Sequence, residues 1–491
     1  MELNLTPSFA RIETAPGSHT VFRTTAPSMK PRTPASALLS RRQFSQTALL
    51  AGGTGLSLQQ VLQLQAANSE PAKDTAVIQV WLGGGHSQFE TFDPKPNAPA
   101  EIRGPYQAIP TRLPGISFCE KLPLTAQVID RAAIIRSITH TTNGHFVAAH
   151  WCSTGYAGTN NVASHPSSGS VAGKFRGPNH PGLPAYVLLS EEHTRNPNIG
   201  EVMGPGHLGT SQSPFLIEQD PFRDAFLASK VNAATANLKL ADDITLDRIA
   251  DRRSLLQDLD RIPRAVDNNG RLDGVDKFTQ VALDMVTNGK ARRAFDLSQE
   301  SKATHDLYGK HRWGQTALLA RRLVEAGVTF VTINTAPDSL CWDWHLNIIN
   351  DKRPADGSNG PSRGMDISGP PLDQMLSALI TDLYQRGLDK KVLLLVWGEF
   401  GRTPKINKTG GRDHWGSLMS ILLAGGGLQV GQVIGASTKH GEVPTERPIG
   451  PTDVLATVYR HLGIDPRHHT VTPEGRPIPL LPDGKPIAEL I

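Results

Sequence analysis

The sequence predicts an α/β protein with a mostly parallel sheet flanked by helices, plus a helical insertion. Three observations predict it. Short β-rich runs alternate with helical patterns along most of the chain, as expected when helices cover a parallel sheet. Runs such as Val392–Trp397 (VLLLVW) are apolar at every position, which is typical of strands buried on both faces. A long charged stretch, residues 190–300, interrupts the alternation and predicts the insertion.

The individual elements follow from these patterns. Six strands are expected, in chain order: Val77–Leu82, Ala132–Arg136, Ala185–Leu189, Val328–Asn334, Val392–Trp397 and Leu418–Ala424. Five helices are expected: Leu122–Asp130, Leu238–Ile262, Lys277–Leu297, Gly314–Ala326 and Asp373–Arg386. Two stretches rich in Gly, Pro and Ser predict long loops, Asn196–Pro214 and Ile349–Pro371. Ligands of parallel sheets bind outside the carboxyl ends of the strands, so the residues after each strand are the candidates for chemistry.

The N-terminal segment, residues 1–70, has the features of an export signal. Arg41 and Arg42 stand in S-R-R-Q-F, and a weakly apolar stretch, Thr47–Leu64, follows them before small residues. This order is typical of a twin-arginine signal. We therefore expect export to the periplasm or the cell exterior, a disordered N-terminal extension, and one folded domain over residues 71–491.

Composition excludes several classes of protein. The formal net charge of +4 is spread over 491 residues without a basic run, so no nucleic-acid partner is expected. No apolar run approaches the ~18 residues of a transmembrane segment. Cys119, Cys152 and Cys341 lack metal-type spacing and allow at most one disulfide.

Residues with metal-binding or catalytic side chains follow four strands. They are His86, Glu90 and Asp93; His140, His145 and His150; Asp343 and His345; and Glu399, Arg402, Arg412, Asp413 and His414. Each alone is compatible with a structural role, such as an ion pair between Glu399 and Arg402. Together they predict a metal site, because histidine with carboxylate suits zinc, manganese or iron. We expect a divalent metal, zinc first, with manganese or calcium as alternatives.

Several strings resemble a known family. They are L-G-G-G-H-S-Q-F-E-T-F-D-P-K-P, R-S-I-T-H-T, H-P-S-S-G-S, L-L-A-R-R-L-V-E-A-G-V, W-G-E-F-G-R-T-P and G-R-D-H-W. They resemble the family called domain of unknown function (DUF) 1501, which is grouped with the alkaline phosphatase and sulfatase superfamily. The resemblance covers residues 71–491 and implies an alkaline phosphatase-like core with a metal-dependent site.

The resemblance also implies roles for individual residues. The superfamily's first metal site corresponds to Asp343, His345 and His414. At its second site Glu399 and Phe400 replace an Asp-His pair, and a further Asp falls at Gly84, which cannot bind a metal. Asp413, His86, Glu90 and Asp93 are the residues that can compensate.

The position of the superfamily's nucleophile corresponds to His145, with Thr141 and Thr142 shortly before it. Three mechanisms stay open: attack by His145, attack by a metal-activated hydroxide, or loss of hydrolysis. Arg402 and Arg412 suit an anionic ester, since guanidinium pairs with phosphate or sulfate oxygens; salt bridges are the alternative. His86 and His150 complete the predicted substrate-binding residues.

The resulting hypothesis is an exported, metal-dependent hydrolase of phosphate or sulfate esters. Its substrate would be an anionic small molecule or polysaccharide. The alternative is a catalytically degenerate binding or assembly protein on the same scaffold, and isomerase or transferase chemistry is a third, weaker idea.

Overall fold

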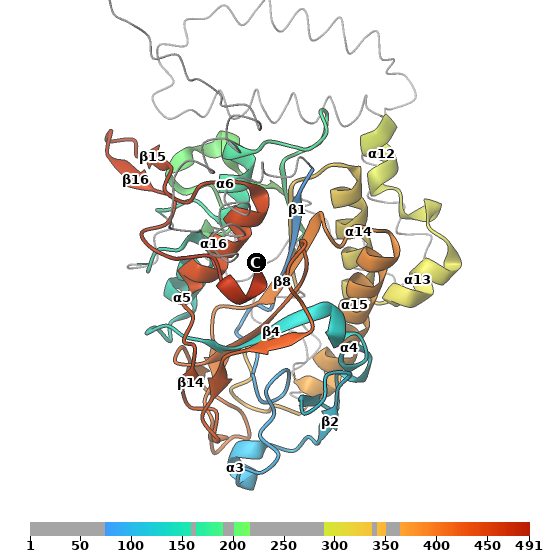
Figure 1. Ribbon diagram of the computed structural model, residues 1–491, viewed down its shortest axis with the longest axis vertical. Helices are drawn as coiled ribbons and strands as arrows, with labels where there is room; N and C mark the ends of the chain where they lie inside the picture. Colours follow the sequence, from blue (N-terminus) through green and yellow to red (C-terminus); the bar gives the residue numbers. More distant parts are fainter. Residues whose placement is uncertain (1–73, 159–163, 190–200, 217–288, 336–340, 350–363) are drawn as a thin grey trace, which may run out of the picture. The chain divides into compact units, whose positions relative to one another are not determined.

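An eight-stranded sheet forms the centre of the described chain (Figure 1). The computed structural model describes residues 74–158, 164–189, 201–216, 289–335, 341–349 and 364–491. In spatial order the strands are β12 (Gln432–Ile434), β4 (Ala132–Ile138), β11 (Met419–Gly425), β8 (Val392–Trp397), β1 (Ala76–Trp81), β7 (Phe330–Asn334), β5 (Tyr186–Leu189) and β6 (Phe215–Leu216). Neighbours pair in parallel, except that β11 runs antiparallel to β4 and β8. The predicted mostly parallel sheet is confirmed, and all six predicted strands are present.

Helices cover both faces of the sheet (Figure 1). In β1, Ile78 and Val80 pack into the apolar cluster under α14 (Arg312–Ala326) and α15 (Met365–Gln385). Val77 and Trp81 belong to the cluster on the other face. That face is covered by α5 (His145–Thr154), α6 (Ser168–Phe175) and α16 (Pro451–Leu462). Burial on both faces explains why the central strands carry no alternating pattern.

Two predicted boundaries are wrong. The expected loop Ile349–Pro371 ends early, because α15 begins at Met365 and contains Pro370 and Pro371. Proline removes helix hydrogen bonds to Asp366 and Ile367, but both residues are exposed, so water can replace those bonds.

The expected helix Leu122–Asp130 is also wrong as a continuous element. It divides into α4 (Pro123–Ala126) and the 3-10 turn η1 (Ile129–Arg131). The carboxylate of Asp373 accepts hydrogen bonds from the backbone N–H groups of Leu124 and Thr125. That cap fixes where α4 begins, which apolar spacing alone cannot reveal.

Other predictions fall partly or wholly outside the described residues. The N-terminal signal and the helix Leu238–Ile262 lie outside them, as does most of the insertion. From Lys277–Leu297 the structure describes α12 (Gly289–Phe295). The predicted helix Gly314–Ala326 is confirmed as α14.

None of the three cysteines forms a disulfide. No described helix is both long and apolar enough to cross a bilayer.

The strand directions bring distant segments to one edge of the sheet. Because β1, β4, β7 and β8 run the same way, their carboxyl ends lie together, and β11 starts at that edge. A small antiparallel pair, β9 (Gly401–Arg402) and β10 (His414–Trp415), sits between β8 and β11 in the sequence and sets His414 opposite Arg402. The fold therefore gathers the segments after β1, β4, β7 and β8 with the segment before β11.

Candidate metal centre

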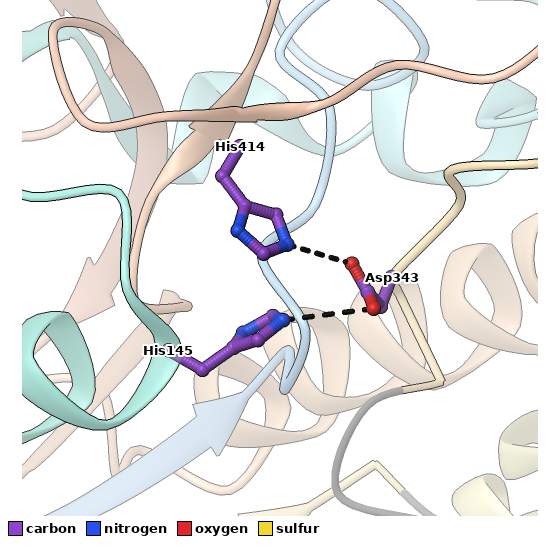
Figure 2. A group of neighbouring side chains, drawn as sticks. All are labelled: His145, Asp343 and His414. Carbon is purple, nitrogen blue, oxygen red and sulfur yellow. Dashed lines mark hydrogen bonds and ion pairs between the residues drawn. The ribbon is translucent and has the colours of Figure 1, made fainter.

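Asp343 lies between His145 and His414 (Figure 2), and His345 is a third histidine beside it. Its Oδ1 lies 2.9 Å from His345 Nε2 and 3.1 Å from His414 Nε2. Its Oδ2 lies 3.5 Å from Nε2 of His145, the first residue of α5. One ligand atom each from His145, Asp343 and His414 fall within 4.8 Å of one another, a spacing that could hold a metal ion. Three segments far apart in sequence thus present imidazole nitrogens to one carboxylate.

The outer nitrogen of each ring is held by an acceptor. Nδ1 of His145 lies 2.8 Å from Glu399 Oε1, and Nδ1 of His345 lies 2.8 Å from Asp413 Oδ1. Nδ1 of His414 lies 2.8 Å from the carbonyl oxygen of Asn143. Carboxylate and carbonyl oxygens accept hydrogen bonds, so Nδ1 carries the hydrogen in each ring. Nε2 then donates to Asp343 when a ring carries both protons, and it offers a lone pair to a cation when the ring is neutral.

The residues of the cluster shift one another's pKa values. Burial opposes the charge of Asp343, but hydrogen bonds from the three histidines and the nearby Arg402 hold its pKa far below the usual range. Burial also opposes the charge of His145, yet Asp343 and Glu399 raise its pKa to about 9. The hydrogen bond to Asp343 raises the pKa of His345, whereas burial lowers that of His414. Such opposed shifts within one cluster are typical of functional sites.

Backbone contacts fix the loops that carry these side chains. The amide of Arg412 donates to the carbonyl of Trp344 at 3.0 Å. A Cβ at Gly411 would lie 2.1 Å from the carbonyl group of His345, so this close approach requires glycine. The ring of Phe400 is fully buried and stacks on His414, with centroids 4.6 Å apart. One wall of the cluster is therefore apolar and tightly packed.

Arg402 joins the cluster, but neighbouring groups already use its guanidinium. Nη2 lies 2.8 Å from Asp343 Oδ1, Nε donates to the Gly85 carbonyl at 2.7 Å, and Nη1 donates to the Arg412 carbonyl at 3.1 Å. The side chain is 1% exposed. Arg402 thus positions Asp343 and the glycine turn after β1.

The predicted substrate-binding residues do not gather at this cluster. Arg412 is buried and forms an ion pair with Glu90 at 2.8 Å. His86 is buried, with Nε2 2.7 Å from the Ser420 carbonyl oxygen. His150 lies in α5, where its Nδ1 lies 2.8 Å from the carbonyl oxygen of Tyr156. Thr141 is exposed in the turn before α5. These positions give no support to substrate contact by Arg412, His86 or His150.

Sequence reasoning missed two contributors. The carbonyl of Asn143 orients His414, and no side-chain pattern signals a backbone acceptor. Phe400 shapes the wall, whereas the sequence marked it only as a replaced histidine. The sequence hypothesis also made His145 a nucleophile, while the structure groups it with the candidate ligands.

Several solved structures are similar to this chain at low sequence identity. Similar solved structures include the PsFucS1 sulfatase from Pseudoalteromonas sp., at 12% identity, covering 82% of this chain and 70% of that chain, with a TM-score of 0.32. The lipoteichoic acid synthase LtaP from Listeria monocytogenes matches at 12% identity, 81% and 74% coverage, and a TM-score of 0.28. The phosphonate monoester hydrolase of Agrobacterium radiobacter matches at 12% identity, 80% and 75% coverage, and a TM-score of 0.27.

All three TM-scores lie below 0.5, so the family assignment depends on sequence alone. No curated protein matches the chain. The family model described as "Protein of unknown function (DUF1501)" matches residues 74–491. The chain therefore belongs to the DUF1501 family.

Proposed function

We propose that this chain is a zinc-dependent hydrolase of phosphate or sulfate esters that is exported from the cytoplasm. The cation would be held by Asp343, His145, His345 and His414. A single observation carries the proposal: three imidazoles direct Nε2 at one carboxylate while each Nδ1 is fixed by an acceptor. Metal-binding histidines almost always have their second nitrogen held in this way.

The spacing of the donor atoms fits a cation. His345 Nε2 and His414 Nε2 lie 2.8 Å apart. Two nitrogens at that distance need a proton or a cation between them, because their lone pairs repel. Tetrahedral zinc with bonds near 2.0–2.1 Å separates its ligand atoms by roughly 3.3 Å. The distances from Asp343 to the three rings, 2.9 to 3.5 Å, are close to that value. Three nitrogens and a carboxylate suit zinc, with manganese as the alternative.

The residues of the centre have distinct parts in the proposed reaction. A zinc ion held there would supply Lewis acidity to a water molecule and to an ester oxygen, which requires it to accept a ligand beyond the four residues. Glu399, Asp413 and the Asn143 carbonyl orient the rings, and Arg402 holds Asp343. The buried Phe400 excludes water from one side of the cluster, which strengthens the electrostatic interactions there. The predicted substrate is an anionic ester, either a small molecule or a polysaccharide.

Metal binding and turnover should be tested together. The full chain is purified without chelator, its metal content is measured, and zinc affinity is determined by competition with a chelating dye. Aryl phosphate and aryl sulfate esters then serve as chromogenic substrates. We expect one zinc per chain and turnover that chelation abolishes. Asp343→Asn should lose both properties, and a wild-type chain that binds no divalent metal would overturn the proposal.

A binding protein without turnover is the second candidate, and the two arginines favour it. Arg402 and Arg412 already bond to neighbouring groups, so neither offers a free guanidinium to an anion. This candidate predicts zinc binding by the wild-type chain and no hydrolysis across a broad panel of phosphate and sulfate esters.

Export is a separate part of the proposal, based on Arg41 and Arg42 in the N-terminal sequence. Residues 1–70 should carry a folded reporter across the cytoplasmic membrane of a bacterium with a twin-arginine pathway. Replacing both arginines with lysine should leave the reporter in the cytoplasm.

A further inference from the structure

We infer that Glu399 is a positioning residue that acts through His145, and that it does not bind the cation itself. This inference depends on the proposed metal centre and assigns one carboxylate a different role from the ligand role that the sequence suggested. Three features of Glu399 support it: the side of the His145 ring on which it lies, the contacts that hold it there, and its ion pair.

The ring of His145 separates Glu399 from the proposed cation position. Glu399 Oε1 lies 2.8 Å from Nδ1, and Asp343 Oδ2 lies 3.5 Å from Nε2. Nδ1 and Nε2 point to different sides of an imidazole ring. A cation between Nε2 and Asp343 therefore contacts His145 directly and Glu399 only through the ring. This is the arrangement of a carboxylate–histidine–metal triad.

Further contacts hold Glu399 in this position. The amide of Gly84, in the turn after β1, donates to the same Oε1 at 2.8 Å. The backbone carbonyl of Glu399 accepts from the Cys152 thiol at 3.5 Å and lies 2.7 Å from His140 Nε2. The side chain is fully buried. Both bonds use Oε1, whereas Oε2 has no hydrogen-bond partner among the described residues, so turning Oε1 toward the cation would break the bond to Gly84 and release His145.

The electrostatic pairing of Glu399 also runs through His145. Among the described residues, His145 is the ion-pair partner that the structure gives this carboxylate. A buried carboxylate needs such a partner. The other buried glutamate at this edge, Glu90, pairs with Arg412 at 2.8 Å and is 1% exposed. Glu90 is thus a matched control: it is equally buried and charged, and it contacts none of the three histidines.

The first experiment needs no metal. With 15N-labelled histidine, the hydrogen-bonded Nδ1 proton of His145 should give a slowly exchanging downfield NMR signal in the metal-free chain. The signal should persist in Glu399→Gln, whose amide oxygen can still accept both hydrogen bonds, and vanish in Glu399→Ala. Absence of the signal from the wild-type chain, or its survival in Glu399→Ala, would overturn the inference.

The second experiment measures zinc affinity of the folded chain. Glu399→Ala should weaken binding by about 10- to 100-fold, as loss of an orienting partner does. Glu399→Gln should recover most of that loss, and Glu90→Gln should change affinity less than about threefold even if it destabilises the fold. X-ray absorption should show the same number of nitrogen and oxygen ligands in wild-type and Glu399→Gln chains.

The outcomes separate the two proposals. Loss of one oxygen ligand in Glu399→Gln would make Glu399 a metal ligand and overturn the inference while the metal centre stands. Unchanged affinity in Glu399→Ala would reduce Glu399 to a structural residue. A wild-type chain that binds no metal would overturn the proposed function, and the NMR signal would still decide whether Glu399 orients His145.

Discussion

Helix α5 contributes to two histidine groups that differ in their hydrogen-bond partners and in the charged groups beside them. The centre histidines are His145, His345 and His414. The outer histidines are His150, His165 and His207, whose rings follow one another at centroid distances of 5.5 and 6.0 Å. Both groups contain three imidazoles and one residue of α5. The difference between them shows which features make the centre group a candidate metal site.

The centre histidines surround a carboxylate, whereas the outer histidines bond to hydroxyl and carbonyl groups or stack. His165 stacks on Tyr156, with centroids 3.9 Å apart. Both nitrogens of His207 are used, by the Ser164 carbonyl at 2.9 Å and by Thr470 Oγ1 at 2.7 Å. The outer rings are therefore held by packing and neutral hydrogen bonds, and the bonds of His207 leave it no nitrogen for a metal.

The pKa values of one histidine from each group, His145 and His165, reflect this difference. Although burial opposes its charge, the pKa of His145 is raised to about 9 by two carboxylates. Burial, together with repulsion from His150 and His207, lowers the pKa of His165 to about 4. Convergent carboxylates thus distinguish the centre group, and the number of histidines does not.

The largest expected difference in zinc affinity comes from removing one ring of each group in turn. His414→Ala should weaken zinc binding on the order of a hundred- to a thousandfold, because it removes one of the four proposed ligands. His165→Ala, the counterpart in the outer group, should change affinity less than about threefold. Competition with a chelating dye measures both, and equal losses would show that the two groups do not differ in function.

The next effect concerns an outer partner of the centre. Asp413→Ala should weaken zinc binding by about tenfold, since it frees the Nδ1 of His345. The low end of the usual range is expected because the Asp413 side chain is 56% exposed. Asp413→Asn keeps an acceptor oxygen and is the matched control. If the asparagine variant binds as weakly as the alanine variant, charge rather than ring orientation is what Asp413 supplies.

A pH effect is expected from the outer group. The folded pKa of His165 is about 4, below its ordinary value of 6.5. Between these pH values the unfolded chain binds more protons, so stability is complete above about pH 6.5 and falls as the pH drops toward 4. His165→Phe keeps a ring on Tyr156 and should make this slope shallower by less than ~1 kcal/mol per pH unit, given the partial exposure.

Urea unfolding of the wild-type and His165→Phe chains at pH 7, 6, 5 and 4 would measure this slope. An identical slope in both chains would mean that His165 does not contribute to acid sensitivity.

The smallest expected effect comes from a neutral hydrogen bond. Thr470→Val removes the hydroxyl beside His207 Nε2 and should lower the free energy of unfolding by about 1 kcal/mol. Zinc affinity should stay unchanged. A loss of zinc affinity in this variant would connect the outer histidines to the metal centre and contradict their purely structural role.

The strands and the edge that carries the site were predictable from the sequence. Fully apolar runs such as VLLLVW mark buried strands whatever their partners are. The carboxyl ends of parallel strands meet, so Asp343, His345, Glu399 and His414 could be grouped before their distances were known. The assignment of all four to one region did not require knowledge of the strand order.

The sequence did not predict which face of α5 meets the site or which charged residues pair with each other. His145 and His150 are five positions apart in one helix, which turns their side chains by roughly 140°. Packing of α5 against the sheet decides which one meets Asp343, and the sequence had placed both at the site. Arg412 and Glu90, 322 residues apart, neutralise each other. Only the tertiary fold shows that this arginine has a buried partner and is not presented to a substrate.

The position of β11 has a consequence for synthesis of the chain. This strand, Met419–Gly425, lies between β4 and β8, and His414 stands shortly before it, in β10. His414 meets its partner Asn143 across 271 residues of sequence. A chain growing on the ribosome therefore cannot assemble the centre until residues near Gly425 have emerged. A captured cation would thus mark a chain that has been made past β11, because products that end before this strand lack the segment that brings the ligands together.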